Sequence, residues 1–245
     1  PAGDAIESGP QGYRALPGAA ALRGGGPDAA ATPRDRLHTL VRELLDSSDG
    51  VEIFQTAERL HVSPATLEAD LGRVRALLGG TQLTLERSAS IARLRGTEAA
   101  QRRLLSRLAH DEMDAGAFDL IALRRALGDG TVDAEALSAF KAALVAELGG
   151  LGYFVNEYGI SDVMMHIAIA ADRVAQGRAL EGAAVIDPES PTATVGGILT
   201  ALSRAHLGVE LGDGDRQHLS ALVLTRVVAP GAAAPADAAR ARLDP

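Results

Sequence analysis

The residues with the clearest potential for chemistry surround His166, which lies in a mostly apolar run. An imidazole titrates near neutral pH, so an unprotonated ring nitrogen is available there as a nucleophile. Asp162 precedes His166 by four residues and Arg173 follows it by seven. At about 100° per residue, the three side chains fall close together on one side of a helix. A nucleophilic ring between an acidic and a basic residue is therefore the first candidate site.

Two interpretations of His166 remain open at this level. A lone histidine at the edge of an apolar stripe is often a hydrogen-bonded structural residue rather than a reactive one. The six histidines lack the mutual spacing of a metal site, and the chain has no cysteine. No Ser/His/Asp order and no pair of carboxylates stands out. The sequence therefore predicts neither an enzyme, nor a bound cofactor, nor a metal site.

The element that must position His166 is a helix predicted over residues 161–176. Ser161 or Asp162 can cap its start, and Gly177 provides a stop. The helix carries one stripe of apolar residues at helical spacing. These residues are Ile160, Val163, Met164, Ile167, Ala171 and Val174.

Length and composition restrict the class of protein. A chain of 245 residues with 47% hydrophobic residues can form one or two domains with substantial cores. Only 3% of the residues are aromatic, and cores built from Leu, Ile, Val and Ala favour helices over sheets. No apolar run reaches the roughly 20 residues that span a bilayer. The absence of cysteine fits a reducing compartment, so we expect a mainly α, cytoplasmic protein that does not cross a membrane.

Charge divides the chain into two parts. Residues 34–112 hold 12 arginines and 12 acidic residues, so the whole formal charge of −8 lies outside this segment. A neutral, arginine-rich segment joined to an acidic one favours two domains with different partners.

The neutral segment has the pattern of a helix-turn-helix. A helix is predicted over residues 34–45, and residues 53–71 match the spacing of two helices joined by a tight turn. Ser63 can cap the second of these, with Pro64 at its first position. His61 occupies the corner, where a glycine is common.

Two alternating runs follow, at residues 82–86 and 91–95, and they are typical of paired strands. Residues 87–90 would form the turn, and a connecting helix is predicted over residues 98–112. Three helices followed by a hairpin predict a winged helix-turn-helix within residues 34–112. The arginines of the connecting helix are expected on a solvated face: Arg102, Arg103 and Arg107.

A winged helix-turn-helix reads DNA with the start of its second helix and holds the phosphate backbone with its hairpin. Glu68 and Asp70 lie on that second helix and would repel phosphates, so we expect weak binding. A winged helix that does not read sequence is the alternative. The candidate DNA contacts are Ser63, Ala65, Thr66, Ala69 and Arg73 on the helix, and Arg87, Arg93 and Arg95 on the hairpin.

The acidic part, residues 113–230, is predicted to be a bundle of five helices. Asp133 and Ser190 are expected caps, with Pro191 at a first helical position. Residues 1–33 and 231–245, rich in Ala, Gly and Pro, are expected to be loose. The five helices are predicted at 118–127, 134–148, 161–176, 192–206 and 215–228.

The run His-Ile-Ala-Ile-Ala-Ala-Asp-Arg-Val, from residue 166, resembles the first histidine motif of a PTS regulation domain (PRD). Such domains occur in transcription antiterminators and activators of the BglG, LicR and MtlR type. With a Mga-like winged helix-turn-helix before it, the resemblance extends from about Arg34 to Val228. It implies that the phosphocarrier proteins of the sugar phosphotransferase system phosphorylate His166. Arg173 would then stabilise the phosphoryl oxygens, and Asp162 would orient the other ring nitrogen.

This chain departs from the family pattern at one position. The second phosphoacceptor of a PRD falls on Leu222, so control by phosphorylation would depend on His166 alone. Residues 7–16 resemble the last strand of an upstream helix-turn-helix unit, although an ordinary flexible tail is equally compatible with them.

The resemblance implies a DNA-binding transcription regulator that responds to sugar uptake. A dimerisation or scaffold module with a structural His166 is one alternative, and a small-molecule sensor is another. An RNA-binding antiterminator is disfavoured, because those proteins begin with a small β-domain. Met165 and Ile169 are apolar outside the main stripe of their helix, so we expect a homodimer through the helical domain.

Overall fold

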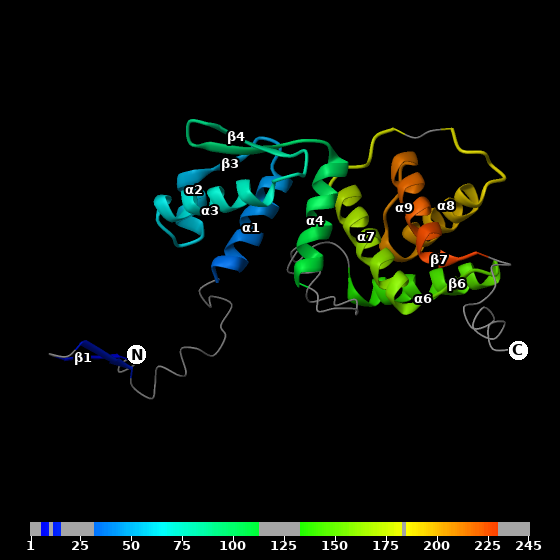
Figure 1. The fold of residues 1–245 in the computed structure, drawn as a ribbon, viewed down its shortest axis with the longest axis horizontal. Coiled ribbons are helices and arrows are strands. Elements are labelled where there is room, and N and C mark those ends of the chain that lie inside the picture. The colour runs from blue at the N-terminus through cyan, green and yellow to red at the C-terminus, as the bar shows by residue number, and fades with distance from the viewer. Residues whose placement is uncertain (1–5, 10–11, 16–31, 113–132, 183–184, 230–245) are drawn as a thin grey trace, which may run out of the picture.

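The structure is a computed structural model, and it describes residues 6–9, 12–15, 32–112, 133–182 and 185–229. It is mainly helical, which confirms the predicted α class (Figure 1). The helices are α1 (Pro33–Asp46), α2 (Ile53–Arg59), α3 (Pro64–Leu77), α4 (Glu98–Glu112), α6 (Ala134–Gly150), α7 (Glu157–Ala175), α8 (Pro191–Leu202) and α9 (Asp213–Arg226). The strands are β1 (Ile6–Gly9), β2 (Gly12–Ala15), β3 (Val51–Glu52), β4 (Thr84–Ser88), β5 (Ile91–Arg95), β6 (Phe154–Val155) and β7 (Val227–Val228).

We call Pro33–Arg95 the N-terminal module; it packs three helices against a small antiparallel sheet. The strand order is β3-β5-β4, with β4 and β5 forming a hairpin. Leu40, Leu44, Leu67 and Leu71 are fully buried between α1 and α3. The Ser63 side chain accepts a hydrogen bond from the Thr66 amide, which confirms the predicted cap of α3.

The corner between α2 and α3 has a strained backbone. His61 adopts a positive φ of 52° there, a conformation that costs an L-residue free energy because its Cβ crowds the following carbonyl. The residue that replaces glycine in the sequence thus keeps the geometry that a glycine would favour.

The first strand of the hairpin is shifted by two residues from its prediction. β4 begins at Thr84 instead of residue 82, and Ser88 pairs with Ile91, so only two residues make the turn. β3 was not predicted, because its two residues are too few to show an alternating pattern.

We call Ala134–Val228 the C-terminal module; it consists of α6 to α9 and the short β6-β7 ladder. Asp133 and Ser190 cap α6 and α8 as predicted, and Pro191 is the first residue of α8. The helix predicted over residues 118–127 lies outside the described residues.

α7 begins four residues before its predicted start, and neither predicted cap is correct. Asn156 is the cap, and its side chain accepts a hydrogen bond from the Gly159 amide. Ser161 is buried inside the helix and donates to the Glu157 carbonyl. Gly159, inside the helix, permits close packing: a Cβ there would lie 2.7 Å from the Arg226 carbonyl oxygen.

The two last helices also depart from their predicted bounds. α8 ends at Leu202, and Ser203–Leu207 forms a π-helical turn instead of extending it. α9 begins at Asp213, so Asp215 lies inside the helix, where it is completely buried.

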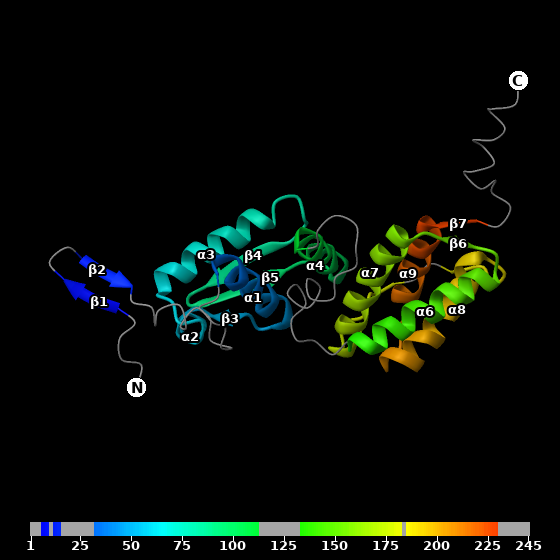
Figure 2. The same ribbon diagram turned by 90° about the horizontal axis from the view of Figure 1, so that it is seen from below.

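α4 joins the two modules and lies between them in both views (Figures 1 and 2). It runs antiparallel to α7, since Glu98 at its start contacts Arg173 and His110 near its end contacts Asp162. Met165 and Ile169 are buried within the chain. They therefore do not provide the exposed apolar surface on which the homodimer prediction was based.

None of the described helices is both long enough and apolar enough to cross a bilayer.

Candidate functional site

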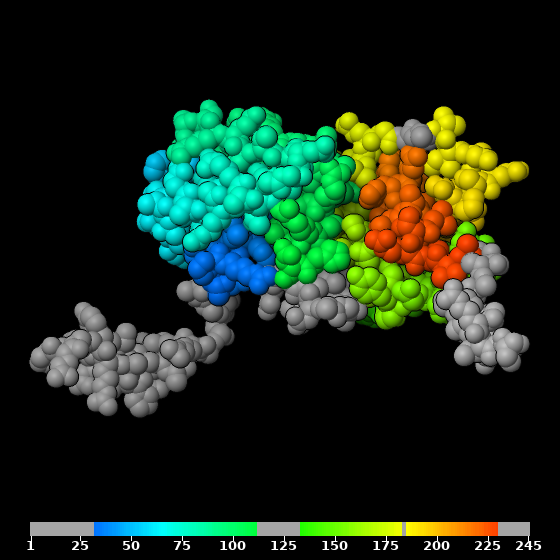
Figure 3. All heavy atoms as spheres, in the orientation of Figure 1, coloured from blue at the N-terminus to red at the C-terminus, as the bar shows by residue number. Residues whose placement is uncertain are grey.

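His166 lies where α4, α7 and α9 meet. Its side chain is 23% exposed, so the ring is held by packing and still reaches the surface. His110 on α4 and His218 on α9 are close enough for their charges to act on it. Figure 3 shows these three helices side by side on one face of the molecule, with α7 between α4 and α9.

Ser106 of α4 determines which nitrogen of the His166 ring is free. Its Oγ lies 3.4 Å from His166 Nδ1, and the same hydroxyl donates a 3.0 Å hydrogen bond to the Arg102 carbonyl. A hydroxyl has one hydrogen, so a hydrogen bond between Ser106 and the ring requires Oγ to accept, which favours the tautomer with the proton on Nδ1. Nε2 therefore keeps its lone pair and is the nucleophilic atom.

Asp162 faces the reactive nitrogen and not the other one, which corrects the predicted role. Its Oδ1 lies 3.8 Å from His166 Nε2 and 3.4 Å from His110 Nε2. Its Oδ2 accepts a 2.7 Å hydrogen bond from Arg226 Nε. Ser106 is thus the residue that contacts the other ring nitrogen, and Asp162 binds Arg226 and lies close to His110 and His166.

Burial lowers the pKa of His166 below its ordinary value of 6.5, and the Asp162 carboxylate opposes this shift. The neighbouring His218, His110 and Arg226 lower the pKa further, because they disfavour a second positive charge. The ring is therefore neutral near pH 7, which is the protonation state that a nucleophile needs.

Arg173 does not support the His166 site, contrary to the prediction. Its side chain is 1% exposed and binds the Glu98 carboxylate with two hydrogen bonds of 2.8 and 2.7 Å. Nη2 also donates to Gln101 Oε1 at 2.7 Å. Seven residues correspond to about 10 Å along a helix axis, and over that distance Arg173 meets the start of α4 instead of the histidine.

Arg102 is also buried, although a solvated position was predicted for it. It pairs with the buried Asp215 of α9 and donates to Glu98 Oε1 at 3.0 Å. Its Nη2 donates to the Arg178 carbonyl at 2.9 Å. Glu98, Arg102, Ser106 and His110 are spaced by four residues on one side of α4, and we call this row the α4 polar row.

The candidate DNA-binding residues of α3 are mostly small or internally bonded. Arg73 Nη1 donates to the buried Asp70 at 2.6 Å, and Arg36 of α1 binds the same carboxylate. Ser63 is occupied by its capping contacts with Thr66. From the sequence, we expected Asp70 to repel DNA phosphates. Instead, Asp70 is buried and its charge is balanced by Arg36 and Arg73.

The hairpin arginines have internal partners too. Arg87 pairs with Glu68 of α3, and Arg95 pairs with Glu86 across the hairpin. Arg93 donates to the Asp49 carbonyl. These contacts reduce the positive charge that the hairpin can offer to a phosphate backbone.

The exposed side of α3 has few groups that could recognise a base. Ala65, Ala69, Gly72 and Ala76 follow one another at helical spacing, and all four are exposed. None carries a side-chain donor or acceptor, so this row cannot make hydrogen bonds to base edges.

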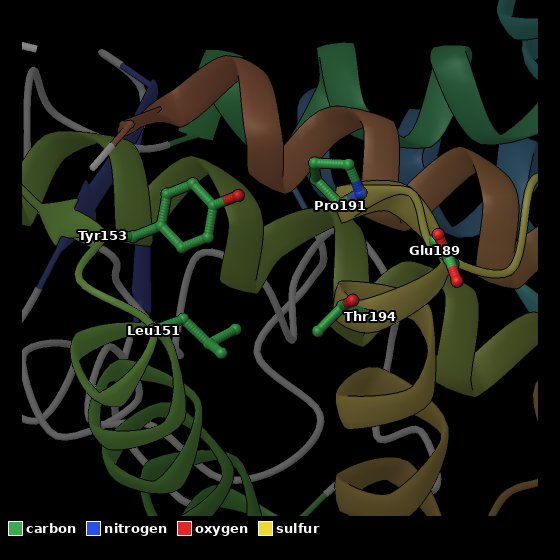
Figure 4. Close-up of a pocket in the computed structure, with 5 residues that line it drawn as sticks. All are labelled: Leu151, Tyr153, Glu189, Pro191 and Thr194. Atoms are coloured by element: carbon green, nitrogen blue, oxygen red, sulfur yellow. The ribbon is translucent and has the colours of Figure 1, made fainter. Parts of the chain in front are cut away.

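A shallow pocket lies away from His166, between the end of α6 and the start of α8 (Figure 4). Tyr153 and Leu151 form one wall, and Glu189, Pro191 and Thr194 form the other.

No cluster of three or more His, Cys, Asp or Glu side chains in the described ranges can hold a metal ion.

Four residues of this site were not identified from the sequence: Ser106, His110, His218 and Arg226. Ser106 and His110 share the four-residue spacing of the α4 polar row, which is the one signal that the sequence offered. His218 and Arg226 lie more than 50 residues from His166. Their proximity depends on how α9 packs against α7.

No protein-family model matches this chain, and no curated protein matches it either.

Proposed function

We propose that this chain belongs to a DNA-binding transcription regulator whose activity is controlled by phosphorylation of His166. The helical domain would be a PRD, and the donors would be the phosphocarrier proteins of the sugar phosphotransferase system. The family assignment, the donor and the cytoplasmic location come from the sequence resemblance. The observation that carries the proposal is the partly exposed ring of His166, with Nδ1 beside Ser106 of α4 and Nε2 on the side of Asp162.

The proposed transfer needs only groups that are present at the site or on the donor. The Nε2 lone pair attacks the phosphorus of the donor's phosphohistidine, and the phosphorus–nitrogen bond to the donor breaks. That electron pair returns to the donor ring. The His166 ring then releases its Nδ1 proton to solvent, and the donor nitrogen takes up a proton.

Through α4, phosphorylation of His166 could affect the N-terminal module. Ser106 and His110 contact the His166 site from α4, and Arg107 of the same helix donates to the Leu77 carbonyl at the end of α3. A new charge at His166 would thus act on a helix that also touches the N-terminal module.

For the N-terminal module, we propose a winged helix-turn-helix that binds DNA weakly. The order of three helices and a β-hairpin supports this fold. The alanine and glycine row on α3 disfavours base recognition, and the internal partners of the hairpin arginines weaken the phosphate contacts that remain. The alternative, a module that does not read sequence, is favoured by the same observations and would leave phosphorylation without an effect on DNA.

The test combines phosphoryl transfer with DNA binding. We expect the phosphorylated phosphocarrier to label the wild-type chain but not His166→Ala, and to change the fluorescence anisotropy of a labelled duplex at low salt. Binding should weaken steeply with added salt, because it relies on phosphate contacts. Tight binding to one sequence would contradict the weak-binding proposal. Labelling without any effect on DNA would favour the scaffold alternative.

A further inference from the structure

Three basic side chains from three helices converge on the Asp162 carboxylate. Arg226 of α9 donates to it at 2.7 Å, His110 of α4 lies 3.4 Å from it, and His166 of α7 lies 3.8 Å from it. Asp162 is mostly buried, with 11% of its side chain exposed. Its negative charge thus occupies the region into which any group bonded to His166 Nε2 would extend.

We infer that Asp162 holds the place of a phosphoryl group, and that Arg226 and His110 exchange this carboxylate for the phosphoryl oxygens when His166 is modified. The inference rests on the proposed function, because it describes the state that phosphorylation of His166 would produce. It assigns to Arg226 the role that the sequence had suggested for Arg173.

The chemistry of the groups favours this exchange. A guanidinium binds carboxylate and phosphate oxygens with the same forked geometry. A phosphoryl group carries about −1.5 to −2 charges near pH 7, more than the single charge of a carboxylate, so the same cations bind it more strongly. Arg226 is 42% exposed, which leaves its side chain room to turn from Asp162 toward Nε2.

The exchange also explains why a carboxylate faces the nucleophile. Before modification, Asp162 binds Arg226 and keeps its guanidinium near enough to act on the charge of the His166 ring. After modification, the carboxylate and the phosphoryl group repel each other, and Asp162 must move or turn away. Because His110 belongs to the α4 polar row, its change of partner would alter the packing of α4 on α7.

A simpler hypothesis is that Asp162 and Arg226 form an ordinary ion pair that holds α7 against α9. The two hypotheses differ in the sign of their mutational effects. If the pair is only structural, Asp162→Asn and Arg226→Gln break the same contact and change the reactivity of His166 in the same direction. If Asp162 holds the place of the phosphoryl group, the first variant removes a repulsive charge and the second removes an attractive one.

Phosphoramidate tests this with the whole chain and without any donor protein. Nε2 attacks its phosphorus, the phosphorus–nitrogen bond breaks, ammonia leaves with the electron pair, and the Nδ1 proton is released to solvent. The rate of phosphohistidine formation is followed by ³¹P NMR. We expect Asp162→Asn to react roughly fivefold faster than wild type and Arg226→Gln roughly fivefold slower, with Arg226→Lys in between.

Arg204→Gln is the matched control, since Arg204 forms a two-bond pair with Glu210 on the surface of the same module. Its rate should equal that of the wild type. Equal rates for Asp162→Asn and Arg226→Gln, or changes in the same direction, would overturn the exchange and leave His166 as the acceptor. Modification of another residue in the wild type would overturn both. Opposite effects with phosphoramidate, but no labelling by any phosphocarrier, would retain the exchange and exclude the proposed donors.

Discussion

At the scale of single residues, Ser106 has the largest influence on the chemistry of the site. Its one hydrogen goes to the Arg102 carbonyl, which obliges it to accept from His166 Nδ1. The sequence could identify His166 as a nucleophile because imidazole chemistry is local. It could not identify the residue that fixes the tautomer, because Ser106 is 60 positions away and belongs to another helix.

The pKa of His166 leads to a prediction about stability. In the unfolded chain the ring titrates near 6.5, and in the folded protein burial lowers this pKa. Well above pH 6.5 the ring is neutral in both states, and its contribution to stability does not change with pH. As the pH falls below 6.5, the unfolded state binds the proton first, so the free energy of unfolding decreases until the lower, folded pKa is passed.

Urea unfolding at a series of pH values between 7.5 and 5 would measure this decrease. The variant His166→Asn should have a shallower decrease than the wild type, because it removes the titrating group. His61→Asn, at the exposed corner of the N-terminal module, is the control and should keep the wild-type slope. A wild-type stability that rises toward pH 5.5 would contradict the assigned direction of the shift.

The buried position of Arg173 gives a second prediction. Arg173→Gln removes the two-bond partner of Glu98, which keeps only Arg102, so we expect a loss of about 1–3 kcal/mol in the free energy of unfolding. Arg226→Gln should cost less, about 1 kcal/mol, because the Arg226 side chain is 42% exposed and His110 stays beside Asp162. Chemical denaturation of both variants compares them directly. If Arg173→Gln were as stable as the wild type, the contact between α4 and α7 would not depend on the Arg173–Glu98 pair.

At the scale of elements, the corner between α2 and α3 can be improved. Glycine adopts the positive φ of His61 without the Cβ penalty, so His61→Gly should stabilise the N-terminal module by about 0.5–1 kcal/mol. His61→Ala keeps a Cβ and should give no such gain, which makes it the matched control. Thermal unfolding of the two variants tests whether backbone strain is the cause. An equal gain in both would point to loss of the imidazole instead.

The contact between α7 and the end of α9 depends on Gly159. Gly159→Ala would place a methyl group 2.7 Å from the Arg226 carbonyl oxygen, and we expect a destabilisation of about 1–3 kcal/mol. Gly197→Ala is the control: a Cβ there meets no atom within 4 Å, so this helical position should gain up to about 1 kcal/mol. If both substitutions stabilised the protein, helix propensity alone would explain Gly159.

Periodicity and turn residues predicted which helices and strands exist better than they predicted where each one begins and ends. The caps at Ser63, Asp133 and Ser190 were correct because each lies next to its own helix in the sequence. The predicted start of α7 was four residues late, so Gly159 fell outside the predicted helix. Gly159 is needed there because α7 packs closely against the Arg226 carbonyl, a contact that the local sequence does not reveal. β3, β6 and β7 were missed because strands of two residues owe their existence to a partner strand, which no local pattern reveals.

At the scale of the whole molecule, the sequence predicted the connecting helix α4 but not its buried contacts with the C-terminal module. The division by charge suggested two segments, and the arginines of α4 looked solvated. Instead, Arg102 reaches the buried Asp215, and Arg103 donates to Gln82 near the hairpin. Long-range ion pairs of this kind depend on packing and leave no trace in local spacing.

The homodimer stays a prediction with a different structural basis. Met165 and Ile169 are covered, but Leu151, Phe154 and Tyr158 of the C-terminal module are exposed, and exposed apolar groups of this size favour self-association. Light scattering at tens of micromolar, with Phe154→Ser as the comparison, tests it. A monomeric wild type would exclude the homodimer at that concentration.

The central claim is that His166 accepts a phosphoryl group on Nε2. The most direct measurement is to phosphorylate the full chain with the phosphocarrier and map the acid-labile phosphate by tandem mass spectrometry, with ¹⁵N–³¹P NMR to identify the ring nitrogen. We predict phosphate on His166, bonded to Nε2, and no phosphate in His166→Ala. Phosphate on His110 or His218, on Nδ1 of His166, or equally in His166→Ala would contradict the claim.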